Sequence, residues 1–234
     1  MISLNRVSVL SGVRLHDKML NILAFLLCNR MSNTVSISGP VSRPFHQPSS
    51  LYAPDGGRKY LNRHERDRVL AAAARLPREK ELFVLTLAWT GARVSEVLAL
   101  TRSSFQVERG LVAVRTLKRR KHHVREIPLP SGLLRTLDEH FVVAAASRLA
   151  GRRLWPWHRS TAWRIVKRVM DEAAIIGRPA APRGFRHGFG VEALRSGVPL
   201  NLVQRWLGHA SLATTAIYAD ASGPEERGFA ERLW

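Results

Sequence analysis

The chain has 234 residues, a length that suits one domain with an extension or two small domains. It carries 37 Lys and Arg residues against 18 Asp and Glu residues, and this net charge of +19 makes nucleic acid the first candidate partner. Anionic lipid ranks lower because no basic amphipathic helix with an aromatic face stands out. The single cysteine, Cys28, excludes an internal disulfide and a cysteine-rich metal site. The longest apolar run is about half of what a membrane span needs, so we expect a cytoplasmic protein without membrane contact.

Residues 1–59 are predicted to form a flexible or partly disordered N-terminal extension. Residues 33–57 are rich in Ser, Pro and Gly, the composition of a linker or a disordered arm. Residues 1–30 show no clear amphipathic period, and Met31 directly precedes the linker. A translation start at Met31 is therefore an alternative that stays open.

Regular patterns begin at residue 60, and the first three predict helices. Asn62 and Glu65 have the spacing of a capping box, so a helix is predicted from here to Leu76. The next two helices are predicted over residues 79–90, a mostly apolar segment, and 94–100.

Two β-rich runs follow, Leu111–Thr116 and Val124–Leu129, and the basic segment Leu117–His123 between them predicts the turn of a β-hairpin. Further helices are predicted over residues 131–149, 160–174, 184–196 and 199–207, with a last one that begins near residue 211 and carries Tyr218. Residues 60–234 are thus predicted as one domain of the α+β class, mainly α-helical, with one small antiparallel sheet.

Three segments of this domain contain motifs that are informative when they are taken together. They are Thr90–Leu98 (TGARVSEVL), Arg183–His187 (RGFRH), and Leu207–His209 (LGH) with Tyr218 nine residues after the histidine. Each is weak alone, but together, in this order and spacing, they resemble the tyrosine recombinase (phage integrase) family. The resemblance runs from about Leu61 to the C-terminus and implies the architecture of that family's catalytic domain.

The resemblance implies DNA cleavage without metal or cofactor. Tyr218 would attack a phosphodiester and keep the bond energy in a 3′-phosphotyrosyl link, releasing a 5′-hydroxyl. Arg93 and Arg186 would hold the extra negative charge of the transition state, because a planar guanidinium is always charged and bonds in pairs. His209 would bind a non-bridging phosphate oxygen, and Glu96 is expected to orient Arg93.

The basic turn would supply the general acid that protonates the departing 5′-oxygen, as a hairpin lysine does in the family. Lys118, at the end of the first strand, is favoured, and Lys121 is the alternative. Arg119, Arg120 and His122, together with Lys121, are expected to bind DNA phosphates.

One position departs from the family pattern. The residue three before the second arginine is usually a histidine, thought to accept the tyrosine proton, and here it is Arg183. Arginine cannot act as a base at physiological pH, so Arg183 is expected to add a phosphate contact beside Arg186. His187 is adjacent but is expected to face elsewhere, which leaves the proton acceptor without a candidate.

Each residue also has a plainer interpretation, as a surface arginine, a helix-end histidine, a core tyrosine or a solvated charge run. The leading hypothesis is a site-specific recombinase of the integrase or resolvase type. A DNA-binding protein with a degenerate, non-cleaving site is the alternative, favoured by Arg183, and a type IB topoisomerase ranks third.

The remaining expectations concern partners. Residues 224–234 predict an amphipathic helix, which would either pack on its own domain or link protomers of a tetramer on DNA, as the resemblance implies. Residues 1–59 are too few for the helical DNA-clamping domain that the resemblance also implies. Accessory DNA-binding proteins are therefore expected to assist a chain that works at the nucleoid.

Overall fold

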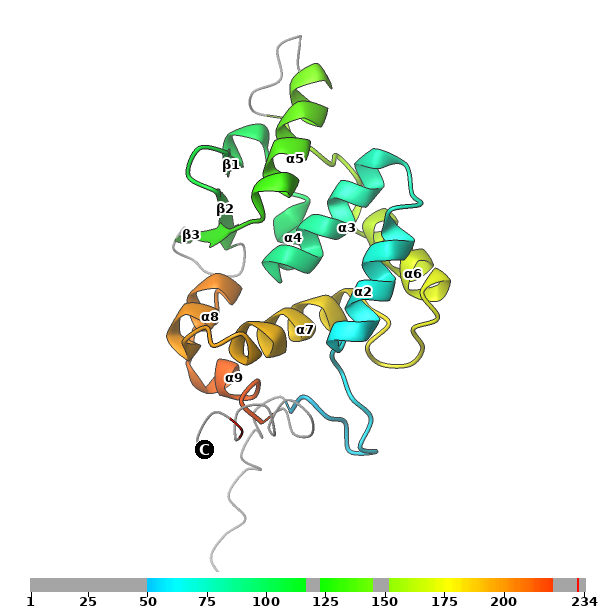
Figure 1. Cartoon of the computed structure of the whole chain (residues 1–234), viewed down its shortest axis with the longest axis vertical. Helices are drawn as coiled ribbons and strands as arrows, with labels where there is room; N and C mark the ends of the chain where they lie inside the picture. The colour runs from blue at the N-terminus through cyan, green and yellow to red at the C-terminus, as the bar shows by residue number, and fades with distance from the viewer. Residues whose placement is uncertain (1–49, 117–122, 145–151, 221–230, 232–234) are drawn as a thin grey trace, which may run out of the picture. The chain divides into compact units, whose positions relative to one another are not determined.

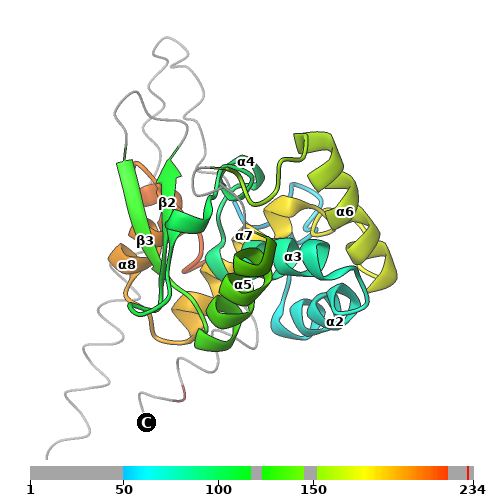
Figure 2. The ribbon, with the colours of Figure 1, turned by 90° about the horizontal axis from the view of Figure 1, so that it is seen from above.

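The computed structural model describes residues 50–116, 123–144, 152–220 and 231, without the side chains of 142–144. All of these belong to one compact unit, His46–Trp234. The unit is mainly helical, with one small sheet beside α5 and α8 (Figures 1 and 2). The α+β prediction is therefore confirmed. Within the described residues, no helix has the length and apolar character needed to cross a bilayer.

Along the chain, a first group of helices is followed by the three strands of the sheet and then by a second group of helices. The helices are α2 (Arg63–Ala73), α3 (Arg78–Thr90), α4 (Val94–Val97), the 3-10 helix η1 (Arg102–Ser104), α5 (Ser131–Ala144), α6 (Arg159–Glu172), α7 (Pro182–Arg195), α8 (Leu200–Leu207) and α9 (Ala213–Ala216). The strands are β1 (Phe105–Gln106), β2 (Leu111–Thr116) and β3 (His123–Pro128).

The capping box predicted for α2 is present. The Asn62 side-chain oxygen accepts a hydrogen bond from the Glu65 backbone N–H at 2.8 Å, and the Glu65 carboxylate accepts one from the Asn62 N–H at 2.9 Å. Two N–H groups that the first turn of the helix leaves without partners are thereby satisfied.

The predicted hairpin is confirmed and extended by one strand. The sheet has the order β1-β2-β3, antiparallel throughout, with Val112 paired to Ile127 and Thr116 to His123. Strand β1 was not predicted, because two residues are too short to show an alternating pattern. The turn itself, residues 117–122, lies outside the described residues.

Some helices are shorter than predicted, and α2 ends at Ala73, three residues before the predicted end at Leu76. α4 ends at Val97, and soon afterwards the chain pairs with a distant segment, since Leu100 O accepts a hydrogen bond from Leu154 N at 2.9 Å. α9 spans only Ala213–Ala216, so Tyr218 lies two residues beyond it, in a turn, and not on the predicted helix.

The buried side chains form two clusters. The larger one contains side chains from the five helices α2 through α6 and from strands β2 and β3. It includes Trp155, whose Nε1 donates to Glu79 O at 3.0 Å. The smaller one contains side chains from α7 and α8, Tyr218, and also Leu51 and Tyr60. Leu51, within the segment predicted as an extension, is 1% exposed, so the chain just before residue 60 helps to bury Tyr218.

Candidate active site

Arg186 on α7 connects two helix ends. Its Nη1 donates to Gly91 O at 2.8 Å and its Nη2 donates to Leu207 O at 2.6 Å. Helix ends leave carbonyls without partners, and a buried guanidinium satisfies one at α3 and one at α8. Because Arg93 and His209 each lie two residues beyond one of these carbonyls, Arg186 draws both predicted site residues toward itself.

Both helices end in a glycine with a left-handed backbone. Gly91 has φ 59° and Gly208 has φ 66°, conformations in which other L-residues are strained. A Cβ on Gly91 would also lie 2.6 Å from the Phe189 ring. The two glycines thus allow the chain to turn sharply toward Arg186 immediately after each helix.

The guanidinium of Arg93 is positioned by an ionic network around the buried carboxylate of Glu96. Arg93 Nη1 donates to Glu96 Oε1 at 2.9 Å, the ion pair expected from the sequence, and Arg125 Nη2 donates to Glu96 Oε2 at 2.6 Å. Burial alone would raise the pKa of Glu96, but its bonds to Arg125 and Arg93 outweigh burial and lower the pKa. Glu96 is therefore ionised and orients both arginines.

Arg125 was missed by the sequence analysis. It is 2% exposed, and its Nε donates to Trp206 O at 2.7 Å while its Nη1 donates to Thr116 Oγ1 at 2.9 Å. Strand alternation places Arg125 on the same face as buried Ile127 and leaves Val124 exposed. The alternation of strand residues between two faces could have indicated Arg125. However, Val124 and Ile127 are both apolar and lie on opposite faces, so the sequence did not show which face is buried.

Tyr218 lies beside these groups and is almost fully buried, at 2% exposed. Its ring passes over Gly190 of α7, where a Cβ would stand 2.7 Å from the ring. Burial raises the pKa of the Tyr218 phenol to about 12, although the charges of Arg186 and Arg93 act to lower it. Both arginines thus stabilise negative charge on the phenolic oxygen, as they would on a phosphate bonded to it.

Arg186 remains charged despite its surroundings. Burial, together with the neighbouring Arg93, lowers its pKa to about 10, well above neutral pH. Among the described residues, two of its five N–H groups are seen to bind carbonyls, which leaves three that can bind an anion.

His209 is held by its own segment. Its Nδ1 lies 2.9 Å from Thr215 Oγ1, and its ring stacks on the Tyr218 ring at a centroid distance of 6.1 Å and an angle of 16°. Burial, with Arg186 and Arg93 nearby, lowers the pKa of His209 to about 3. The imidazole is therefore neutral at pH 7, and with Nδ1 occupied its Nε2 is the nitrogen left to donate to an oxygen.

The expectation that His187 faces away was wrong. Its Nδ1 lies 3.3 Å from Tyr218 Oη, and the two ring centroids are 5.9 Å apart. A signal for this was available, because His187 is four residues after Arg183 and therefore shares its face of α7. Arg183 itself is exposed, and its charge acts on His187.

The predicted residues of the basic turn, Lys118 to His122, lie outside the described residues. The strand that leads to them is nevertheless tied to the site. Thr116, two residues before Lys118, is 3% exposed and is linked through Arg125 to Glu96 and Arg93.

Comparison with known proteins identifies the family. The model of the phage integrase family matches residues 59–224, which contain Arg93, Arg186, His209 and Tyr218. The chain belongs to the phage integrase family. The match begins one residue before the predicted domain start.

Curated relatives within the phage integrase family are tyrosine recombinases. The chain is 34% identical to tyrosine recombinase XerA of Pyrococcus furiosus over 169 residues, which is 67% of this chain and 56% of that protein. It is 36% identical to tyrosine recombinase XerD of Chlorobaculum tepidum over 138 residues, 55% of this chain and 44% of that protein. The chain thus spans about half the length of these relatives.

Solved structures of recombinases agree with the fold. A crystal structure of XerA recombinase matches 74% of this chain and 64% of its own, with a TM-score of 0.65 at 26% identity. A pre-cleavage complex of XerH recombinase bound to difH substrate matches 76% of this chain and 58% of its own, with a TM-score of 0.60 at 20% identity. The second likeness concerns the fold alone.

Proposed function

We propose that this chain is a site-specific DNA recombinase that cleaves and rejoins double-stranded DNA through a 3′-phosphotyrosyl intermediate on Tyr218. The supporting observation is the double hydrogen bond of Arg186, which connects the carbonyls preceding Arg93 and His209 beside the phenol of Tyr218. Three groups able to bind an anion thus come from three different segments to one tyrosine.

Each side chain has a role in the proposed reaction. The phenolic oxygen of Tyr218 forms a bond to phosphorus while the bond to the 5′-oxygen breaks. Arg93, Arg186 and His209 bind the non-bridging oxygens, whose negative charge grows in the transition state. Lys118, or Lys121 as the alternative, protonates the 5′-oxygen, and Arg119, Arg120 and His122 bind adjoining phosphates. No bound metal or cofactor is assigned a role.

The partners follow from the same proposal. Double-stranded DNA is the substrate, supported by the net charge of +19 and by the DNA complex of the similar XerH recombinase. A tetramer on DNA, linked through the C-terminal segment, would bring four tyrosines to two duplexes, and accessory DNA-binding proteins would assist recognition. The setting would be the nucleoid in the cytoplasm.

A library of nicked duplexes tests the function on many candidate target sequences at once. Each duplex carries a randomised segment around a nick, so that cleavage releases a short strand and traps the covalent adduct. Duplexes that remain bound to the wild-type chain in denaturing detergent are recovered and sequenced. We expect a defined sequence to be enriched, and the Tyr218→Phe variant to form no adduct on it.

The outcome also separates the two classes of function. A protein that binds library duplexes but never becomes attached to them would be a non-cleaving DNA-binding protein. An adduct formed equally by Tyr218→Phe would move the nucleophile to another residue. The acid is assigned on a duplex with a 5′-bridging phosphorothioate, whose leaving group needs no proton and should rescue Lys118→Ala.

A further inference from the structure

The hydroxyl of Tyr218 has a specific neighbour. His187 Nδ1 lies 3.3 Å from Tyr218 Oη, and within the part of the chain that the structure describes this is the hydrogen bond seen for that hydroxyl. The His187 side chain is partly buried, and it approaches the phenol from α7, the helix that also carries Arg186. The atom that loses a proton on attack is therefore already in contact with a nitrogen that can take one.

Helix geometry explains why His187 reaches this position. Residues 183 and 187 lie one turn apart on the same face of α7, and residue 190 continues that face. Gly190 has no Cβ, which lets the Tyr218 ring pack directly against the helix backbone, and the hydroxyl extends back toward His187. Arg183, at the first of these positions, cannot accept a proton, but a base is present one turn later.

We infer that His187 is the general base of the cleavage step, which takes the proton of Tyr218 as its oxygen attacks phosphorus. The inference rests on the proposed function, since it assigns a proton within that reaction. The bond between Tyr218 Oη and phosphorus forms and the bond from phosphorus to the 5′-oxygen breaks. The phenolic proton moves to His187 Nδ1, and the 5′-oxygen receives a proton from Lys118. In rejoining, His187 returns its proton to Tyr218.

Electrostatics keeps His187 in the form that a base requires. Burial, with the charges of Arg186, Arg183 and Lys59, lowers its pKa to about 4, so the imidazole is neutral at pH 7. A bound phosphate offsets the positive charge of these arginines and so favours protonation of His187 as the reaction proceeds. The phenol becomes far more acidic as its oxygen bonds to phosphorus, and the proton transfers during attack and not before it.

The other histidine of the site is arranged differently. His209 bonds through Nδ1 to Thr215 Oγ1, and its ring lies nearly parallel to the ring of Tyr218. A lone pair of an imidazole lies in the plane of its ring, so this stacking does not direct a nitrogen of His209 at the phenol. His209 is therefore left to bind the phosphate, and His187 takes the proton.

The first test is single-turnover cleavage by His187→Asn on the nicked duplex selected by the wild-type chain. An asparagine amide can occupy the place of Nδ1 and hydrogen-bond to the phenol, but it cannot accept a proton. We expect cleavage to slow by about 10²- to 10⁴-fold, the usual effect of removing a general base. His64→Asn, which changes an exposed histidine on α2, should cleave like the wild type.

A second substrate distinguishes loss of a base from loss of structure. A duplex strand ending in a 3′-p-nitrophenyl phosphate is joined when a neighbouring 5′-hydroxyl expels p-nitrophenolate, which leaves without a proton. With Tyr218→Phe as the background, this reaction still needs the phosphate-binding residues, and it needs Lys118 to take the hydroxyl proton. It does not need a base for tyrosine. His187→Asn should therefore leave joining unchanged within about threefold, while Lys118→Ala should slow it.

The outcomes assign each failure to one hypothesis. Wild-type cleavage rates in His187→Asn, or equal losses in cleavage and joining, would overturn the role of His187 and leave the recombinase proposal intact. A wild-type chain that forms no adduct with any duplex, and a Tyr218→Phe chain that joins no activated strand, would overturn the proposed function and the role of His187 with it.

Discussion

His187 and His209 are two partly buried histidines surrounded by positive charge. Their pKa values fall to about 4 and about 3, first because of burial and then because of Arg186 and its neighbours. An exposed histidine in the unfolded chain has a pKa near 6.5. Between these values the unfolded chain binds more protons than the folded one, so the folded state loses stability as the pH falls.

The consequence is a pH-dependent free energy of unfolding. The free energy of unfolding should be highest above pH 6.5 and should decrease from there to about pH 4 for His187 and about pH 3 for His209, with about 3 kcal/mol of the loss due to His187. Urea unfolding measured across this range checks it. The His187→Asn variant should show a smaller decrease, and identical profiles for the two proteins would mean that His187 titrates normally in the fold.

At the scale of single residues, the sequence predicted those candidate site residues that lie in motifs with a characteristic spacing. Arg93, Arg186, His209 and Tyr218 could be proposed as site residues because their motifs follow one another at characteristic distances. The spacing of His187 from Arg183 indicates its face of α7, but its contact with the Tyr218 hydroxyl depends on the turn after α9, where the Tyr218 ring packs against Gly190. A periodic pattern identifies the face of a helix but does not identify what rests on it.

Among the elements, β3 has a special position because one of its side chains holds several others. Arg125 binds the end of β2 through Thr116, the end of α8 through Trp206 O, and α4 through Glu96. Two of these three elements lead directly to predicted site residues, His209 after α8 and Lys118 after β2. A buried ion pair of this kind is worth little compared with apolar packing, but the loss of one partner leaves a charge unpaired in the interior.

We predict that Arg125→Met lowers the free energy of unfolding by about 3–5 kcal/mol, because Glu96 loses a buried partner. Chemical denaturation with urea measures the change. The matched control is Arg168→Met on α6, whose pair with Glu172 has the same kind of contact at 2.9 Å but an arginine that is 69% exposed. That control should lie within about 0.5 kcal/mol of the wild type.

Adding Glu96→Gln to Arg125→Met should restore part of the lost stability, because the second change removes the unpaired charge. If Arg125→Met alone is as stable as the Arg168→Met control, Arg125 does not hold these elements together.

The boundaries of the elements also show what the sequence could not predict. The ends of α2 and α3 carry local signals in Asn62 and Gly91, whereas the early end of α4 reflects pairing with residues some fifty positions away.

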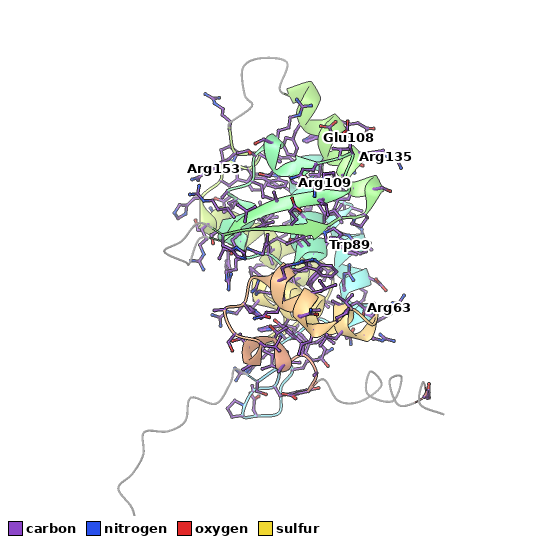
Figure 3. All side chains as sticks on the ribbon, turned by 90° about the vertical axis from the view of Figure 1, so that its left-hand side faces the viewer. Arg63, Trp89, Glu108, Arg109, Arg135 and Arg153 are labelled. Carbon is purple, nitrogen blue, oxygen red and sulfur yellow. The ribbon has the colours of Figure 1, made fainter. Side chains whose placement is uncertain are left out.

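For the molecule as a whole, the dominant property is its positive charge. Exposed arginines lie on well-separated elements, and Figure 3 labels Arg63 on α2, Arg109 before β2, Arg135 on α5 and Arg153 before α6. Charge distributed in this way attracts a polyanion from a distance and releases counterions on contact. The basic turn adds four cationic residues, Lys118 to Lys121, at one place.

We therefore predict that binding to duplex DNA weakens steeply with salt, by about 10³-fold between 50 and 200 mM for six phosphate contacts. Fluorescence anisotropy with a labelled duplex gives the slope of log affinity against log salt. Replacing Arg119, Arg120 and Lys121 with Gln should reduce the slope by about 0.9 for each phosphate that the protein no longer neutralises. Replacing Arg68, Arg75 and Arg78 removes the same charge from exposed positions on α2, on α3 and in the turn between them. A slope reduced equally by both sets would show that the basic turn makes no special contact.

If Tyr218 is the nucleophile of the proposed recombinase, its burial also affects how the protein would react with DNA that is not its target. A phenol with a pKa near 12 is ionised in only about one molecule in 10⁵ at pH 7, about a hundredfold less than an exposed tyrosine. A cell contains millions of phosphodiesters other than the correct one, and each chance encounter offers an opportunity for damage. In the proposed reaction, this low background reactivity would keep Tyr218 from attacking DNA at the wrong site, so selectivity would begin with the protonated ground state of the nucleophile, before any base pair is recognised.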